Sequence, residues 1–508
     1  MIPTAKLSAL ALAASALLSS AAAQSAATSA ASAPLAAAHG VAAPDTTHLS
    51  LSDAVGIALA TSDEVQQAIA LTEIADAQVT TARAGALPQL RFNSGYTHQF
   101  ANARAAIVGS VFNQPNSYTS TFSFSQPLFQ GGRLIAASRA ATDVRAASRL
   151  TAAETRATVT VAVQRAYLDA LVTGRIAGLQ ARNLQLSGER LAQVEQFEKA
   201  GRAARYDVLR ARVERANIEP LVIQARNDHE LAMLELKRLL NIPVEQPVAL
   251  TTTLDPDATR ALAARLGADA ESAPLPVGRA ALQAAEATLR ARREGVAIAR
   301  ADFLPTLAFQ ASGGFTALPP AGQNRFPTSR GFASNALCPA GSAATRVCQN
   351  GGWFEDGSFG FTFSLPLFDG LRAKGNLDLA QANRRLAELE LRQTREEVAV
   401  DVARARAELA RAEATFDARR ATSSEAEEAF RLATLRFNRG LSTQLEVTDA
   451  QLALLTAQTG EARAVAELHL ASVDLARALG RAIPLTAGGE VRPGADRPSM
   501  SSSVPSTR

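Results

Sequence analysis

Two acidic residues near the carboxyl end of the chain have the spacing of a cation-binding pair. Glu446 and Asp449 are three positions apart, so on a helix their carboxylates lie on one face. Carboxylate oxygens attract cations, and rings of acids in a pore select for cations and bind divalent ions. Most acidic pairs on helices are solvated surface groups, however, so the spacing alone leaves both interpretations open.

The patterns that would indicate an enzyme are not present. There is no glycine-rich phosphate loop, no paired-histidine motif and no nucleophile elbow. The acids and arginines are spread along helical stretches as solvated faces. The sequence therefore predicts neither an enzyme nor a metal or cofactor site. None of the five histidines lies close in sequence to the two cysteines, Cys338 and Cys348; the histidines are His39, His48, His98, His229 and His469.

The two cysteines indicate a structural cross-link. Cys338 and Cys348 lie close together in a Gly/Ala/Pro-rich loop. In an exported protein such a pair is typical of one disulfide that staples a loop. A metal site would require further ligands nearby, so we predict a disulfide.

The composition favours long helices. The chain has 508 residues, is rich in alanine, and draws nearly all of its basic residues from arginine. Ala, Arg, Leu, Glu and Gln are good helix formers. The formal net charge is only +4, and no stretch combines dense basic residues with aromatics, which excludes nucleic acid as a favoured partner.

The amino-terminal residues have the pattern of an export signal. Lys6 precedes an apolar run over 7–18, and small residues before Gln24 form a cleavage site, so residues 1–23 are predicted to be a signal peptide. Residues 24–48 are predicted to be a flexible segment. No later run reaches the ~18–20 apolar residues of a membrane-spanning helix.

The chain repeats one plan twice. Gln-Pro-Leu-Phe-Gln-Gly at 126–131 corresponds to Leu-Pro-Leu-Phe-Asp-Gly at 365–370, and Gly201 corresponds to Gly440, both at an offset of about 239 residues. Each repeat reads helix, strand, loop, strand, long helix, turn and helix. We predict a first repeat over 49–270, a second over 271–485 and a disordered tail over 486–508.

Four segments alternate aromatic with small polar residues. Phe122 and Phe124 alternate with Thr and Ser, and Phe359, Phe361 and Phe363 alternate with Gly, Thr and Ser. Such alternation over about ten residues is typical of transmembrane β-strands. An ordinary half-buried sheet is the alternative, but four strands among long helices would leave raw edges. Closing the strands into a barrel would remove those edges. Because four strands cannot close around a lumen, several copies of the chain must contribute.

The helices between the strands are too long for a globular core. Residues 134–199 and 371–438 run without proline, on the order of 100 Å each at ~1.5 Å per residue. We expect coiled-coil packing, a kink at Pro220, and a packed rather than ligating His469. The closing helix has a heptad seam at Leu445, Leu452, Thr459, Ala466 and Val473, complemented by Thr448, Leu455, Ala462, His469 and Ala476.

The ordered set of repeated motifs over about 49–485 resembles the TolC-like outer-membrane efflux proteins. The resemblance implies a mainly α fold with a transmembrane β portion: a homotrimer whose three sets of four strands form a twelve-stranded barrel. A long antiparallel α-helical coiled-coil barrel would continue it into the periplasm, with a collar near 241–273 and after Gly480. The turns between strands and helices would be marked by Pro88, Pro127, Gly131, Pro305, Pro366 and Gly370.

The resemblance also implies a function and partners. The chain would form the passive exit duct of a tripartite efflux or type I secretion system in the outer membrane of a Gram-negative bacterium. It would contact outer-membrane lipid, a periplasmic adaptor and an inner-membrane pump. Glu446 and Asp449 would form a ring of six acids at a closed periplasmic end. The adaptor would meet the helix–helix turns at Gly201, Arg202, Ala203, Gly440, Leu441, Ser442 and Thr443.

A different class of protein shares part of this pattern. A periplasmic adaptor or a structural coiled coil of the cell envelope would also have long helical hairpins. It would lack paired aromatic-alternating strands, and an adaptor would usually carry a compact β-domain between its helices. The sequence does not indicate the transported substrate, the pump class or the adaptor.

Overall fold

The structure is a computed structural model that describes residues 46–101, 115–272, 278–317, 353–486 and 489–491. The predicted signal peptide, most of the predicted flexible segment, most of the predicted tail, and Cys338 and Cys348 lie outside the described residues. The residues from Thr47 onward form one compact unit. No described helix is both long enough and apolar enough to cross a membrane.

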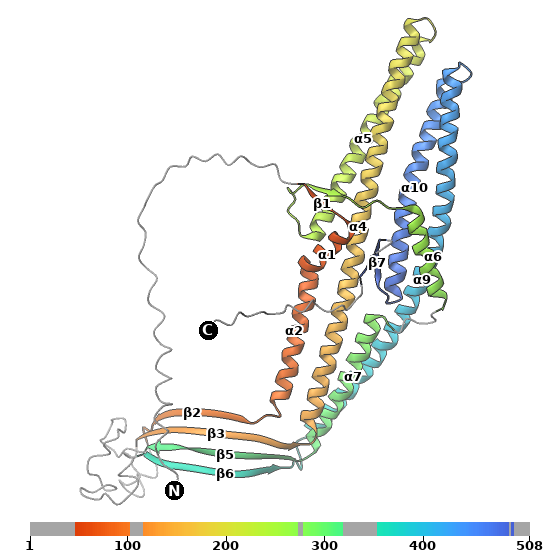
Figure 1. Ribbon diagram of the computed structural model, residues 1–508. Helices are drawn as coiled ribbons and strands as arrows, with labels where there is room; N and C mark the ends of the chain where they lie inside the picture. The colour runs from red at the N-terminus through yellow and green to blue at the C-terminus, as the bar shows by residue number, and fades with distance from the viewer. Residues whose placement is uncertain (1–45, 102–114, 273–277, 318–352, 487–488, 492–508) are drawn as a thin grey trace, which may run out of the picture. The chain divides into compact units, whose positions relative to one another are not determined.

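Four long strands form one antiparallel sheet (Figure 1). They are β2 (Gln89–His98), β3 (Asn116–Gln130), β5 (Thr306–Ala317) and β6 (Trp353–Ser364). Their order in the sheet is β2-β3-β5-β6, so each repeat contributes two neighbouring strands. β2 and β6 are edge strands, and in the part of the chain that the structure describes each has one side without a partner strand. The sheet therefore has the four predicted strands and two free edges.

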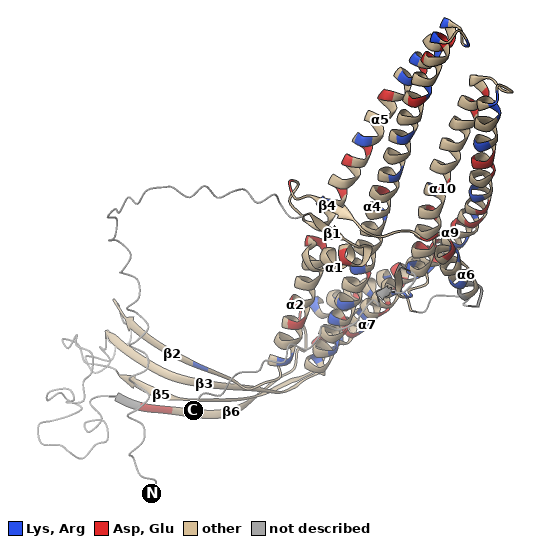
Figure 2. Ribbon diagram, turned by 45° about the horizontal axis from the view of Figure 1, so that its top comes forward, with Lys and Arg blue, Asp and Glu red and all other residues tan. Residues whose placement is uncertain are grey.

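The two faces of the sheet have opposite chemistry. On one face Phe92 pairs with Phe122, their ring centroids 4.8 Å apart, and Phe309 lies 5.3 Å from Phe361. The other face carries the hydroxyl residues of β3 at alternate positions, such as Thr121 and Ser123. Figure 2 shows how few charges the described strands hold; by sequence they are Arg91, Glu355 and Asp356.

One proline lies in a strand where the sequence predicts a turn. Pro127 pairs with Ala308 inside β3, and the register shifts between Pro127 and Phe129. Proline has no backbone N–H to give to the ladder, so within a sheet it is accommodated at an irregularity. In the second repeat β6 ends at Ser364, and Pro366 follows the strand as predicted.

Two very long helices leave the sheet. α4 (Arg133–Lys199) and α9 (Arg372–Asn438) have 67 residues each, and their first residues are 239 positions apart. Each turns back into a shorter helix, α5 (Arg205–Leu240) or α10 (Gln444–Ala478). Pro220 lies inside α5. Figure 1 shows the resulting hairpins α4/α5 and α9/α10.

The helical stretch before β2 is divided in two, whereas the repeat plan predicts one helix before the first strand. α1 (Leu51–Thr61) ends and α2 (Asp63–Ala84) begins around Ser62, whose backbone is extended (φ −62°, ψ 128°). Serine is favoured at helix starts, and the acids that follow suit the positive end of the helix dipole. The corresponding segment before β5 is α7 (Ala280–Arg300).

Short elements pack against the middle of the long helices, and we call them the collar. Short strands β1 (Thr47–Leu49) and β4 (Val248–Leu250) pair in parallel, and α6 (Pro256–Ser272) packs on α9 and α10. β7 (Ile483–Thr486) pairs with β8 (Gly489–Val491). β1 thus begins within the predicted flexible segment 24–48, and β8 lies within the predicted tail 486–508.

Helix α10 has two sides that pack differently. One side packs on α9, where Leu468 and Leu475 join Leu409 and Phe416 in a buried cluster. The predicted heptad seam lies on the other side. Its collar half is buried: Ala466 clusters with residues of α4, and Val473 packs with Val161. Its half nearer the α9–α10 turn stays open, with Leu445 42% and Leu452 61% exposed.

Candidate gate and partner-contact site

Both helical hairpins turn with the same backbone hydrogen bonds. At the first turn the N–H of Arg202 donates to the carbonyl of Phe197 (2.8 Å), while Gly201 has a left-handed φ of +68°. At the second turn the N–H of Leu441 donates to the carbonyl of Arg436 (2.9 Å), and Gly440 has a φ of +74°. This is the Schellman arrangement, in which glycine takes the left-handed position without steric cost.

The residues after each glycine differ. Arg202 lies over the ring of Phe197, 5.1 Å from its centroid, and Ala203 follows it. In the second turn Leu441 is 67% exposed, and Thr443 caps α10 by accepting the N–H of Glu446 (3.4 Å). Ser442 donates to the carboxylate of Glu446 (2.9 Å). The second turn therefore presents an apolar side chain beside hydroxyl groups, whereas the first presents a basic one.

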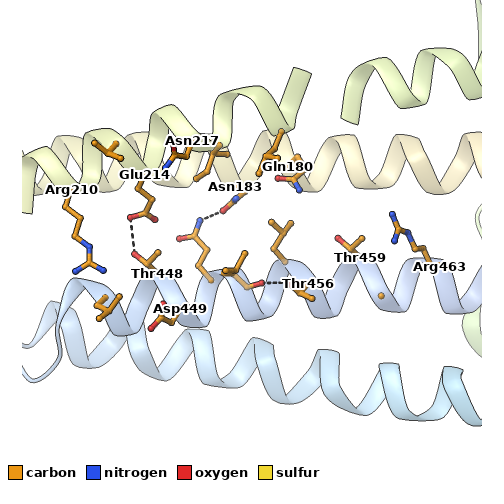
Figure 3. A pocket seen from close by; sticks show the side chains of 18 of the residues that line it. Gln180, Asn183, Arg210, Glu214, Asn217, Thr448, Asp449, Thr456, Thr459 and Arg463 are labelled. Carbon is orange, nitrogen blue, oxygen red and sulfur yellow. Dashed lines mark hydrogen bonds between the residues drawn. The ribbon is translucent and has the colours of Figure 1, made fainter. Parts of the chain in front are cut away.

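The two predicted acids lie on the first turns of α10, with different surroundings. Glu446 accepts the bond from Ser442 and lies 3.9 Å from Arg436 across the turn. Asp449 is exposed and lines a groove between α5 and α10 (Figure 3). Within the described residues no ion pair is formed by Asp449. Arg436 and Glu446 belong to the same hairpin, so this contact does not join the two hairpins.

A polar cluster joins the two hairpins beside this groove, and sequence reasoning missed it. Arg190 of α4 donates to Thr448 of α10 (3.0 Å) and to Gln451, and lies 3.5 Å from Glu214 of α5. Thr448 also donates to Glu214 (3.2 Å) (Figure 3). Gln451 in turn donates to Asn183 of α4, so α4, α5 and α10 are tied together. We call Arg190, Asn183, Glu214, Thr448 and Gln451 the inter-hairpin cluster.

The inter-hairpin cluster is largely shielded from water. The side chains of Arg190 and Glu214 are 10% and 20% exposed. Burial lowers the pKa of the Arg190 guanidinium, and the charge of Glu214 opposes that shift. The Arg190 guanidinium stays charged in the folded protein. Replacing Arg190 by a neutral residue would therefore leave the Glu214 carboxylate without its ion-pair partner. Only Thr448 was singled out by the sequence, through the heptad spacing; Arg190 and Glu214 stand among many arginines and glutamates, and no local signal marks them.

The remaining predicted turn residues lie between strands and helices. Pro88 directly precedes β2, and Pro305 directly precedes β5. Gly131 and Gly370 have left-handed φ values of +59° and +69° just before α4 and α9. A Cβ on Gly131 would lie 2.7 Å from the Cβ of Leu304, so this position also requires a small residue.

No metal centre is formed by the described residues. They contain no group of three or more His, Cys, Asp or Glu side chains that could hold an ion. His469 is 2% exposed and packed, as predicted, with its Nε2 3.3 Å from the side-chain oxygen of Gln164. The predicted disulfide partners Cys338 and Cys348 lie outside the described residues.

Known proteins share both the sequence pattern and the fold. The outer membrane protein OprJ of Pseudomonas aeruginosa is 29% identical over 201 residues, 39% of this chain and 36% of OprJ. The toluene efflux pump outer membrane protein TtgF of Pseudomonas putida is 26% identical over 418 residues, 80% of this chain and 78% of TtgF. The crystal structure of the outer membrane protein VceC of Vibrio cholerae superposes with a TM-score of 0.63 at 21% identity, covering 85% of this chain and 96% of VceC.

A family model decides the assignment. The model described as "Outer membrane efflux protein" matches residues 54–241 and 277–481, which is most of the chain. The match runs across both long hairpins and the strands before them, so the TolC-like resemblance and the outer-membrane location predicted from the sequence are confirmed. The chain belongs to the outer membrane efflux protein family, whose members are channels and not enzymes.

Proposed function

We propose that three copies of this chain close into one outer-membrane channel. The sheet has one face of aromatic side chains and one of hydroxyl groups, which suits a wall between lipid and a watery bore. Its edge strands β2 and β6 each leave a row of backbone groups unpaired. In lipid these groups must be satisfied, and pairing β6 of one copy with β2 of the next does so. Three copies of four strands make a twelve-stranded barrel.

The helices would continue this barrel as a tunnel. α4 and α9 follow directly on β3 and β6, and each pairs with an antiparallel partner. Twelve helices from three copies would surround a bore, with the collar around their middle. The equal lengths of α4 and α9 support a plan of two repeats per chain, whose hairpins alternate around the wall.

The inner end of the tunnel would be a gate. In a trimer Glu446 and Asp449 become six carboxylates around one axis, and such a ring attracts cations. The inter-hairpin cluster lies within a few residues of them, because Thr448 lies between the two acids in sequence. We assign the cluster the role of holding α10 against α4 and α5 in the closed state. Opening would break these bonds and expose the charges to water.

Other proteins would supply the energy for transport and deliver the solute to the channel. The channel offers a passive path, an inner-membrane pump would supply energy, and a periplasmic adaptor would contact the turns at Gly201–Ala203 and Gly440–Thr443. TtgF is a toluene efflux protein by name. The proposed activity of this chain is efflux or secretion of solutes across the outer membrane.

The observation that carries the proposal is the two-faced sheet with free edges running into paired long helices. Its test is the conductance of the purified protein in a planar lipid bilayer, with and without divalent cations. We expect small, cation-selective steps that divalent cations block. Failure to insert or conduct, under conditions in which a related channel conducts, would sink the channel proposal.

The gate has its own test in the same bilayer. In Glu446→Ala/Asp449→Ala the divalent block should be lost while the channel remains. Arg190→Ala removes the hydrogen bonds of Arg190 to Thr448 and Gln451, so the closed state should be weakened and the open probability of the channel should rise several-fold. Arg392→Ala, an exposed arginine of α9 outside the cluster, serves as the control. Block that survives the double substitution keeps the channel and removes the ring from the gate.

A further inference from the structure

Among the described residues of the four-stranded sheet, one arginine lies on the face that carries the hydroxyl groups. Side chains alternate between the two faces of a strand, so Arg91 lies on the face opposite the ring of Phe92. Arg91 pairs with Ser123 of β3, whose hydroxyl donates to the carbonyl of Arg91 (3.5 Å). Ser123 pairs with Ser312 of β5, and Ser312 pairs with Ser358 of β6. Arg91 therefore stands at one end of a row of uncharged hydroxyl groups that crosses the sheet.

The charge of Arg91 is not neutralised by the described part of its own chain. The side chain is exposed, its Nη2 donates to the side-chain oxygen of Gln89 (3.2 Å), and it forms no ion pair with a described residue. Asp356 is the acid on the same face, in the acidic segment of β6 that Figure 2 shows. It lies two residues from Ser358, about 15 Å from Arg91 across three strand spacings. This separation exceeds the Debye length of about 8 Å at physiological salt.

The internal repeat indicates what a neighbouring copy would place beside Arg91. Arg91 corresponds to Ala308, because each is the third residue after the proline that precedes its strand. Ala308 pairs with Pro127, which corresponds to Pro366. If copies join as the two repeats do, Arg91 of one copy faces the uncharged Pro366 of the next. The acid nearest to Pro366 in sequence is Asp369, whose carboxylate already accepts a backbone N–H of α9 (2.8 Å).

We propose that Arg91 makes the barrel favour anionic solutes, because three copies would place three guanidinium groups around the wall of one bore. The inference rests on the proposed function, and it adds a specificity-determining residue at the opposite end of the channel from Glu446 and Asp449. Rings of arginine select for anions in pores, and side chains that face the lumen of a barrel tune its selectivity. Since Ala308 takes the corresponding place in the second repeat, each copy contributes one arginine to the ring.

The chemistry of the guanidinium group defines the solutes that the ring would favour. Arginine stays charged in proteins, and its planar donors match the oxygens of carboxylate and phosphate groups. The serine hydroxyl groups beside Arg91 carry no charge that would cancel this attraction. The field of the ring extends by about one Debye length, about 8 Å at physiological salt and about 30 Å at 10 mM. We therefore expect a preference for solutes with carboxylate or phosphate groups that weakens as salt is added.

A thiol on the neighbouring strand measures the electrostatic potential beside Arg91. In the full chain with Cys338 and Cys348 replaced by Ser, Ser123→Cys places a thiol at the position paired with Arg91. Its rates of reaction with an anionic and a cationic methanethiosulfonate give a ratio that depends on the local potential. At about 10 mM salt, Arg91→Gln should lower the anionic-to-cationic ratio about threefold, whereas Arg91→Lys should preserve it. A ratio that Arg91→Gln leaves unchanged overturns the proposal.

Ion selectivity in a planar bilayer tests the effect of Arg91 on permeation. The background is Glu446→Ala/Asp449→Ala, so that the proposed acidic gate does not mask the barrel. From reversal potentials in a dilute KCl gradient, Arg91→Gln should lower the ratio of chloride to potassium permeability about twofold, and Arg91→Lys should leave it unchanged. If Arg91→Gln weakens the trimer without changing the ratio, Arg91 forms an ion pair between copies instead, and the proposal is overturned.

Two adjacent acids of β6 provide a matched control for the face of the sheet. Asp356 lies on the hydroxyl face, whereas Glu355 shares the face of Phe359 and Phe361. Asp356→Asn should therefore raise the chloride-to-potassium ratio about twofold, and Glu355→Gln should leave it unchanged. Equal shifts would mean that charge acts alike from either face, which overturns the bore-facing role of Arg91. Protein that conducts and responds to Asp356→Asn, but not to Arg91→Gln, keeps the proposed function and loses this inference; protein that never conducts loses both.

Discussion

The side chain of His469 is buried at a place where a charged imidazole would be shielded from water. It is buried between α10 and α4, and its Nε2 lies 3.3 Å from the side-chain oxygen of Gln164. Gln164 in turn donates to the carbonyl of Pro484 (3.1 Å), so one series of polar contacts joins α10, α4 and strand β7. Burial lowers the pKa of His469 from 6.5 to about 4. The folded protein therefore holds this residue neutral at physiological pH.

Acid should therefore destabilise the collar. The unfolded chain takes up this proton below about pH 6.5, whereas the folded chain takes it up only near pH 4. The stability is fully present above pH 6.5 and is lost as the pH falls toward 4, by about 2 kcal/mol per chain at pH 5. Urea unfolding followed by helical circular dichroism at pH 8 and pH 5 measures it. In His469→Gln the drop between the two pH values should shrink by that amount; an unchanged drop would assign the acid sensitivity to other groups.

A buried hydroxyl group joins the first described residues of the chain to α4. Tyr167 is fully buried, and its hydroxyl donates to the carbonyl of Leu49 (2.8 Å) and accepts the N–H of Thr252 (3.2 Å). Tyr167→Phe leaves both backbone groups without this partner, which should cost about 1–3 kcal/mol in urea unfolding. Tyr206→Phe, at a 69% exposed tyrosine of α5, should change it by less than about 0.5 kcal/mol. Equal effects would contradict the role assigned to the buried bond.

Two glycines at helix ends are required for different reasons, one for its backbone conformation and the other also for close packing. Gly440 and Gly480 both follow a long helix with left-handed φ values of +74° and +67°. A Cβ on Gly440 meets nothing within 4 Å, whereas a Cβ on Gly480 would lie 2.7 Å from the backbone nitrogen of Arg279. The first glycine is needed for conformation only, and the second also for the close approach of two backbones.

Alanine at the two positions should thus have unequal effects. Gly440→Ala should cost about 1 kcal/mol of unfolding free energy, from the left-handed backbone alone. Gly480→Ala adds a steric overlap worth about 1–3 kcal/mol more. Asparagine, which tolerates the left-handed region, should largely restore the Gly440 site and not the Gly480 site. Equal losses of unfolding free energy in both alanine variants would show that the backbone at Arg279 moves away from residue 480 without measurable cost.

The sequence predicts elements where a local pattern determines them. The starts and ends of α4 and α9 follow from glycine turns and an uninterrupted run of helix formers, and the strands follow from aromatic alternation. The break at Ser62 and the bulge at Pro127 were missed because each depends on how the chain packs next to it. In the candidate site, Glu446 and Asp449 can be found by spacing. Arg190 meets Glu214 and Gln451 only after three helices have come together, so no pattern in one segment reveals it.

In the whole molecule, the edges of the four-stranded sheet are the basis of the proposed association of copies. β2 and β6 are the outer strands, and each has one side without a partner in the chain. An apolar sheet with open edges would aggregate without limit unless the series of copies closes on itself. In the proposed channel β6 of one copy would pair with β2 of the next, and three copies of four strands would complete the twelve-stranded barrel.

Cysteine cross-linking between the edges should reveal this closure. Asn93→Cys on β2 can be combined with Ser358→Cys, Gly360→Cys or Thr362→Cys on β6, each with Cys338 and Cys348 replaced by Ser. At the matching register, mild oxidation should give two-chain and three-chain species on denaturing gels and nothing larger. Asn93→Cys with Thr121→Cys, which are register partners within the sheet, is the internal control and should cross-link inside one chain. A ladder that runs past three chains would mean an open array, and cross-links of the control alone would mean that β2 and β6 of neighbouring copies never meet.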